Sequence, residues 1–247
     1  MAEFRSYLFD LYGTLADIRT DEKSRLLWEK TALFYGETGA PYEPRELRAR
    51  YLALCRAEQE RHRDPLYEIE LRKVFRALYE EKGRSPSPRD ADAAALFFRV
   101  TSTKKLRLYP WVLPVLRQIR AEGAKAYLLS NAQSCFTRPE LRLLGLDALL
   151  DGVVISSDAH IRKPSPRILR KLLRDYGVDP ASALMTGNEQ RSDVAAAHAC
   201  GIPALYLQTE TSAPYDPAFA AERELLDEDY ARLPALLGLE HDPLSRR

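Results

Sequence analysis

The chain has 247 residues, 45% of them hydrophobic and 30% charged, which is enough for a core domain together with a smaller insert. Its formal net charge is +1, from 37 basic and 36 acidic residues, so charge gives no reason to expect nucleic acid or an anionic membrane as a partner. We expect no membrane helix, because no apolar run approaches roughly 20 residues, and no signal peptide. Three scattered cysteines form no disulfide framework, so we expect a cytoplasmic protein.

The N-terminal segment predicts a buried strand followed by a turn. Tyr7-Leu8-Phe9 is a short apolar run that ends at Asp10, and Gly13 follows soon after. Beyond it, apolar residues recur at helical spacing in four segments separated by Gly and Pro, namely 24–35, 44–60, 67–82 and 88–103. We therefore expect an all-helical stretch over residues 17–106.

Strand and helix patterns alternate after Tyr109-Pro110. The expected strands are 125–129, 152–156, 183–186 and 204–207. The expected helices are 112–122, 139–144, 166–176 and 193–200, with a short last one near 233–237. This alternation indicates an α/β fold with a parallel, doubly wound sheet. The predicted organisation is an α/β core domain of residues 1–16 and 107–247, interrupted by a helical domain of residues 17–106.

Polar residues gather where the predicted strands end, and ligands of open α/β sheets bind outside those carboxyl ends. Each group alone has an ordinary explanation as a turn or a helix cap. Their order and spacing together make them candidates for one site. The groups are Asp10 with Leu11-Tyr12-Gly13-Thr14, Ser130-Asn131, Lys163-Pro164, and Gly187-Asn188-Glu189 with Asp193.

These groups resemble, in order, the four sequence motifs of the haloacid dehalogenase-like hydrolases, over roughly residues 5–208. The resemblance implies a Rossmann-like core, and the helical insert matches the position of that family's type C1 cap. It also implies that Asp10 is a covalent nucleophile, with Thr14 fixing the turn beside it. In the second motif, Ser130, followed by Asn131, would hold the transferred group.

The other two motifs supply charge. The resemblance implies that Lys163 steadies the nucleophile and the transferred group, and that Glu189 and Asp193 hold Mg²⁺. A carboxylate nucleophile divides hydrolysis into two displacements, but it repels an anionic phosphate unless cations lie nearby. Because Mg²⁺ prefers hard oxygen ligands, we expect its ligands to be Asp10, the backbone carbonyl of Tyr12, and Glu189 or Asp193.

Two positions depart from the pattern of the family's phosphatases. Those enzymes usually carry a second Asp two residues after the nucleophile, as general acid and base. Here that residue is Tyr12, whose ordinary pKa is near 10. The string Asp-Leu-Tyr-Gly-Thr-Leu also resembles the 2-haloacid dehalogenases, which lack the second Asp and use no metal. Glu189 stands where the phosphatases usually have Asp, and its carboxylate favours metal and phosphate.

The favoured function is therefore a Mg²⁺-dependent phosphatase that acts on a small phosphorylated metabolite, a phosphate ester, through Asp10. A metal-free 2-haloacid dehalogenase and a non-catalytic binding protein on the same fold stay open as alternatives, because fold alone does not choose among them. The sequence indicates neither the particular substrate nor an oligomeric state.

Overall fold

The computed structural model describes residues 2–241, 243 and 244. Its centre is a six-stranded sheet in the order β5-β4-β1-β6-β7-β8, in which every pairing is parallel. The strands are β1 (Ser6–Phe9), β4 (Lys125–Ser130), β5 (Gly152–Ile155), β6 (Ala183–Gly187), β7 (Ala204–Leu207) and β8 (Arg223–Leu225). A separate antiparallel ribbon joins β2 (Ala16–Thr20) and β3 (Thr103–Leu108).

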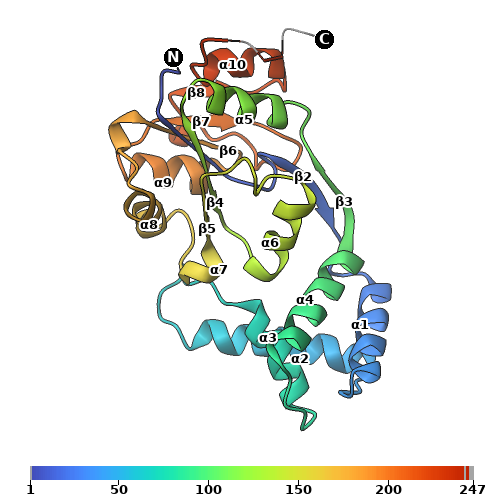
Figure 1. Ribbon diagram of the computed structural model, residues 1–247. Coiled ribbons are helices and arrows are strands. Elements are labelled where there is room, and N and C mark those ends of the chain that lie inside the picture. The colour runs from blue at the N-terminus through green and yellow to red at the C-terminus, as the bar shows by residue number, and fades with distance from the viewer. Residues whose placement is uncertain (1, 242, 245–247) are drawn as a thin grey trace.

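The helices form two groups, shown in Figure 1: four together at one end of the molecule and the others around the sheet. The first group is α1 (Arg25–Glu37), α2 (Pro44–Glu60), α3 (Leu71–Glu80) and α4 (Pro88–Ser102). The second is α5 (Val112–Ala121), α6 (Ser134–Leu143), α7 (Ser156–Ala159), α8 (Pro166–Tyr176), α9 (Ala195–His198) and α10 (Leu233–Leu236). Short helical turns cover Pro180–Ser182, Gln190–Val194, Pro217–Phe219 and Tyr230–Arg232.

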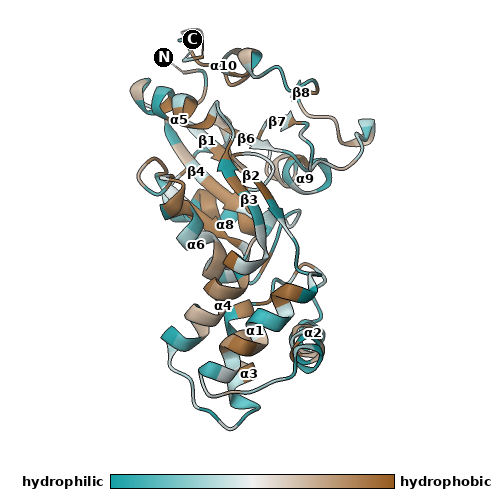
Figure 2. Ribbon diagram, turned by 90° about the vertical axis from the view of Figure 1, so that its right-hand side faces the viewer, coloured by the Kyte–Doolittle hydropathy of each residue, from teal (hydrophilic) through white to brown (hydrophobic). Residues whose placement is uncertain are grey.

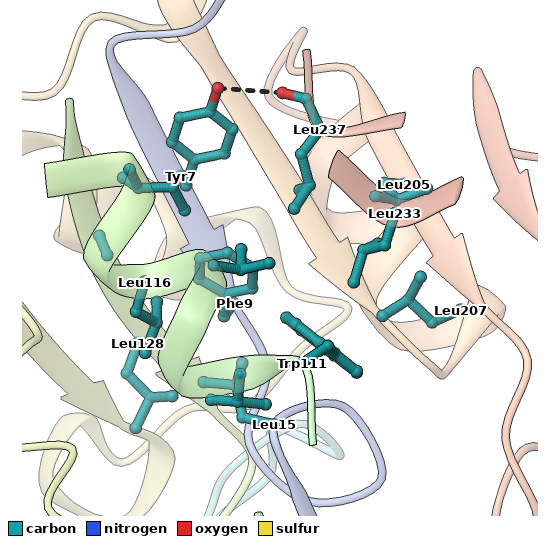
Figure 3. Packing of buried hydrophobic residues seen from close by; sticks show 14 of the residues in the cluster. Tyr7, Phe9, Leu15, Trp111, Leu116, Leu128, Leu205, Leu207, Leu233 and Leu237 are labelled. Carbon is teal, nitrogen blue, oxygen red and sulfur yellow. Dashed lines mark hydrogen bonds between the residues drawn. The ribbon is translucent and has the colours of Figure 1, made fainter. Parts of the chain in front are cut away.

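The sheet is buried on both faces, and β1 shows how. Tyr7 and Phe9 point into a cluster covered by α5, α6 and α10, whereas Leu8 points into the opposite cluster, under α8 and α9. Figure 3 shows the first cluster, in which the Tyr7 hydroxyl donates to the carbonyl of Leu237 at 2.9 Å. Because side chains alternate along a strand, a run that is apolar on both faces marks a central parallel strand.

The insert between β2 and β3 has its own apolar core, built around Trp28, Tyr35, Phe75 and Phe98. Figure 2 shows its helices banded in teal and brown, as expected of amphipathic helices that bury one side. Phe136 of α6 belongs to the same cluster. The insert therefore packs directly on the α/β part of the chain as well as being joined to it by the ribbon.

The structure confirms the α/β class, the parallel sheet and the helical insert, and it corrects several details. Residues 17–106 are not helical throughout, because β2 and β3 lie at the two ends of that range. The three-residue edge strand β8 was not predicted, since it is too short for a periodic pattern. Helix α6 begins at Ser134 and not at the predicted Pro139, which lies inside it. The predicted helix 67–82 begins later, at Leu71, and the segment before it lies against the core.

Candidate active site

The predicted site residues meet at the carboxyl end of the sheet. Phe9 is in register with Leu128 on one side and with Thr186 on the other, so the residues that follow these strands are neighbours. They line a pocket of about 680 Å³, a size usual for small-molecule sites. The lining residues are Asp10, Tyr12, Leu66, Glu68, Ser130, Asn131, Arg162, Lys163, Pro164, Asn188, Glu189, Arg191, Ser192, Asp193 and Thr211.

Lys163 lies between the charged groups of the site. Its Nζ donates to Oδ1 of Asp10 at 2.7 Å, to Oδ1 of Asp193 at 2.6 Å and to the carbonyl of Leu129 at 2.7 Å. Lys163 is 2% exposed and Asp193 1%. Burial opposes the charge of the ammonium, but the two carboxylates outweigh it and raise the pKa of Lys163. Burial raises the pKa of Asp193, against the opposing influence of Lys163.

The second oxygen of Asp10 is held only weakly. Thr14 Oγ1 lies 3.5 Å from Asp10 Oδ2 and 3.3 Å from Asn188 Oδ1, and Thr14 itself is fully buried. The backbone N–H of Asp10 donates to the carbonyl of Thr186 at 2.9 Å. Lys163 thus orients one oxygen of the carboxylate while the other remains available to a reacting group or a cation.

Two glycines make this close arrangement sterically feasible. Gly13 has φ +82°, and a Cβ there would lie 2.3 Å from Asn188 Nδ2. A Cβ on Gly187 would lie 2.2 Å from Asp193 Oδ2. Any side chain at these positions would displace the loop after β1 or the carboxylate beneath Lys163.

Ser130 and Asn131 have different surroundings. Asn131 fastens the backbone of Lys163, because its Nδ2 donates to the Lys163 carbonyl at 3.0 Å and its Oδ1 accepts from the Lys163 N–H at 2.8 Å. Ser130 is 1% exposed, and its hydroxyl has no hydrogen-bond partner among the described residues. A buried hydroxyl without a partner is costly, and a ligand oxygen in the pocket would satisfy it.

The fourth motif forms the opposite wall. The backbone N–H of Glu189 donates to Asp193 Oδ2 at 3.0 Å, so both oxygens of Asp193 have partners. The Glu189 side chain is exposed and lines the pocket. In the described part of the chain, no three His, Cys, Asp or Glu side chains lie close enough together to hold a metal ion by themselves.

The Tyr12 hydroxyl faces α6 and is not placed to act as the general acid and base that the family's phosphatases usually carry at this position. The hydroxyl contacts Glu140 and lies 3.0 Å from Thr137 Oγ1, both on α6. Arg99 of α4 donates to the same glutamate at 2.6 Å. Burial and the negative charge of Glu140 raise the pKa of Tyr12 far above its ordinary value. Tyr12 therefore contributes to the junction between the insert and α6, and its hydroxyl is poorly suited to give up a proton.

Several pocket residues were given no role from the sequence, among them Glu68, Arg162 and Arg191. Asn188, 3% exposed, was named in the fourth motif without a role, and its Oδ1 lies 3.3 Å from Thr14 Oγ1. Glu68 and Arg162 come together because the Arg162 N–H donates to the Leu66 carbonyl at 3.0 Å. No local pattern marks that contact, because it joins the insert to a loop of the core almost a hundred positions away.

Residues 4–201 match the haloacid dehalogenase-like hydrolase family, and the chain belongs to that family. In the part of the chain that the structure describes, none of the helices combines the length and the apolar character needed to cross a bilayer.

Two solved structures share the fold over nearly the whole chain. A HAD phosphatase from Thermococcus onnurineus has a TM-score of 0.61 at 22% identity, covering 96% of this chain and 99% of that one. A 2-haloacid dehalogenase from Pseudomonas syringae has a TM-score of 0.65 at 22% identity, covering 95% and 98%.

Similar sequences include several phosphatases. Phosphoserine phosphatase of Thermus thermophilus is 34% identical over 135 residues, 55% of this chain and 53% of that protein. Glyceraldehyde 3-phosphate phosphatase of Methanopyrus kandleri is 30% identical over 128 residues, 52% and 55%. Phosphoglycolate phosphatase of Cupriavidus necator is 31% identical over 167 residues, 66% and 71%. The chain thus spans about half the length of the first two.

Proposed function

We propose that this chain is a phosphatase that hydrolyses a small phosphorylated metabolite through a covalent intermediate on Asp10. The observation that carries the proposal is the buried contact of Lys163 with Asp10 beside the unpartnered hydroxyl of Ser130. An oriented carboxylate, a fixed cation and a free donor are the groups that phosphoryl transfer to a side chain requires. The phosphatase names of the relatives support the same reaction class.

In the proposed reaction, the Asp10 carboxylate attacks phosphorus and displaces the leaving oxygen. Lys163 orients Asp10 and stabilises the charge on the transferred group, and the Ser130 hydroxyl donates to a phosphoryl oxygen. Water then attacks phosphorus and frees the Asp10 carboxylate. Arg162 and Arg191 add positive charge to the pocket, which favours an anionic substrate.

The pocket fits Mg²⁺ as a further cation. Its lining holds four carboxyl groups and three cationic side chains, so an anionic phosphate adds negative charge that these cations do not balance. Oδ2 of Asp10 and Oδ1 of Asn188 approach the same Thr14 hydroxyl and lack a cationic partner. We propose that Asp10, the Tyr12 carbonyl and Glu189 or Asp193, with Asn188 beside them, hold Mg²⁺ together with waters, as that ion tolerates. Bound there, it would neutralise charge on the phosphate.

The substrate class follows from size and polarity. Phosphoserine, phosphoglycolate and glyceraldehyde 3-phosphate, named for the relatives, are small polar monoesters. A pocket of about 680 Å³ whose lining is mainly charged or amide-bearing suits such molecules.

A metal-free dehalogenase is the second candidate, because Tyr12 replaces the carboxylate that the phosphatases carry. Its substrate would place a carbon–halogen bond in the pocket, and among the described lining residues only Leu66, Pro164 and Tyr12 have apolar or aromatic side chains. The polarity of the pocket therefore favours phosphate.

A substrate panel separates these functions. Phosphate release is measured from the three named monoesters and from p-nitrophenyl phosphate, with Mg²⁺ and with a chelator, and halide release from chloroacetate and 2-chloropropionate. We expect Mg²⁺-dependent phosphate release that Asp10→Asn abolishes while the protein stays folded. Halide release without metal would establish the dehalogenase. If neither phosphate nor halide is released, the non-catalytic binding protein is the remaining candidate.

A further inference from the structure

The proposed reaction needs a proton donor that its sequence motifs do not supply. The leaving oxygen of an alkyl phosphate must be protonated as its bond to phosphorus breaks, and the attacking water must later lose a proton. Position 12 holds no carboxylate, and the Tyr12 hydroxyl is directed at Glu140.

Three carboxyl groups besides Asp10 line the pocket among the described residues: Glu68, Glu189 and Asp193. Asp193 is unsuitable, since its two oxygens accept from Lys163 and from the Glu189 N–H. Glu189 is exposed to solvent and is one of the residues proposed to hold Mg²⁺. Glu68 differs from both, because it is half-buried and comes from the helical insert on the side of the pocket away from the strand ends.

The segment that carries Glu68 is fastened to the core. Gln133 Nε2 donates to the carbonyl of Ile69 at 2.9 Å, and the Leu71 N–H donates to Gln133 Oε1 at 2.8 Å. Arg162 Nη2 donates to the carbonyl of Pro65 at 3.1 Å. These bonds lie on both sides of Glu68 and hold its backbone over the pocket.

The hydrogen bonds of the Glu68 carboxyl suit both of its protonation states. Gln133 Nε2 donates to Oε1 at 3.1 Å, and the Ser156 hydroxyl donates to Oε2 at 3.2 Å. Ser156 has another acceptor, the carbonyl of Ala132 at 3.1 Å. When Glu68 carries a proton, Ser156 can donate to Ala132 and accept from Glu68, so neither state leaves the carboxyl unpaired.

The surroundings also favour the neutral form. Burial raises the pKa of Glu68, while Arg162 and the bonds from Ser156 and Gln133 oppose the rise. Two further titratable groups, His160 and Tyr67, lie close by, and their side chains stack on one another. His160 Nδ1 lies 3.4 Å from the Glu68 backbone carbonyl. A neutral Glu68 also removes one negative charge that would face the phosphate.

We propose that Glu68 is the general acid and base of this enzyme, a role that rests on the proposed phosphatase activity. In the first step the Asp10 oxygen bonds to phosphorus, the bond from phosphorus to the leaving oxygen breaks, and that oxygen takes the Glu68 proton. In the second step the oxygen of a water molecule bonds to phosphorus, and the Glu68 carboxylate takes a proton from that water. The Asp10–phosphorus bond then breaks, and both side chains return to their starting states.

Glu68→Gln tests this assignment, with Glu70→Gln as matched control. Glu70 lies two positions away, contacts Lys73 at 3.6 Å and does not line the pocket. We expect Glu68→Gln to lower kcat/KM on an alkyl phosphate by about 10²–10⁴-fold, and to change kcat/KM on p-nitrophenyl phosphate by less than about tenfold, because nitrophenolate leaves without a proton. With the aryl ester, the slowed second step should give a burst of nitrophenol.

The pH profile and a rescue provide independent readouts. The fall in kcat/KM on the alkyl ester as pH rises through the Glu68 pKa should be absent in Glu68→Gln and present in Glu70→Gln. Formate should restore part of the alkyl phosphatase activity of Glu68→Ala. Equal losses on both esters, no loss on either, or no burst would overturn the assignment. Failure of the unmodified protein on both esters would instead overturn the proposed phosphatase activity.

Discussion

Replacing Lys163 with Met removes the cation that two buried carboxylates share. Met has nearly the length of Lys and fills the same space, so the change is mainly electrostatic. Asp10 and Asp193 both lie within hydrogen-bond distance of Lys163 Nζ, and without it they face each other unpaired. Breaking a buried ion pair by removing one partner costs about 3–5 kcal/mol. For a chain of this size that loss lowers the melting temperature by roughly 6–20 °C.

The loss should depend on pH in a defined direction. An unpaired buried carboxyl has a folded-state pKa above its unfolded value, so the folded protein takes up protons and recovers stability as pH falls. Thermal unfolding followed by circular dichroism should show a larger difference from the unmodified protein at about pH 7 than at about pH 5. Lys163→Met combined with Asp193→Asn should regain stability but not activity. An unchanged melting temperature at both pH values would refute the description of this charge cluster.

Two other positions give predictions of different kinds. Asp17 forms ion pairs with Lys105 at 2.7 Å and with Arg107 at 3.0 Å across the β2–β3 ribbon. Burial opposes the charge of Asp17, but these two cations lower its pKa below the ordinary 3.8. Asp17→Asn should therefore lower the free energy of unfolding by about 1 kcal/mol above roughly pH 4, and leave it unchanged at lower pH, where Asp17 is protonated. Urea titration measures the difference, and a difference that persists in acid contradicts the assignment of these ion pairs. Gly187→Ala should lower the free energy of unfolding by about 1–3 kcal/mol and abolish turnover, because the added Cβ would displace Asp193. Phosphate release near the unmodified rate would show that Asp193 can move without loss of activity.

The sheet and the strand-end residues were predictable because their signals are local. Tyr7-Leu8-Phe9 is apolar on both faces and ends at a polar residue, and parallel strands bring such ends together. Asp10 and Ser130 line one pocket for that reason, whereas Lys163 lies in the loop between α7 and α8 and was found through the motif resemblance. The roles of these residues in catalysis, and the predicted boundaries at 16/17 and 106/107, stay predictions.

Other features depend on contacts between distant segments. The direction of the Tyr12 side chain is set by Glu140 and Arg99, which lie on two helices far along the chain. Glu68 falls in a stretch with helical spacing, but the hydrogen bonds of Gln133 and Arg162 hold that stretch against the core. Propensity is a weak prior where tertiary contacts compete for the backbone.

A phosphoryl group carried by Asp10 can be trapped during turnover. The protein is mixed with p-nitrophenyl phosphate and Mg²⁺, quenched in acid during the first turnover, digested and examined by mass spectrometry. We expect a phosphoryl group on the peptide that contains Asp10, absent from Asp10→Asn and gone after a chase without substrate. Phosphate release with the phosphoryl group on another residue, or with no covalent intermediate during the first turnover, would contradict it.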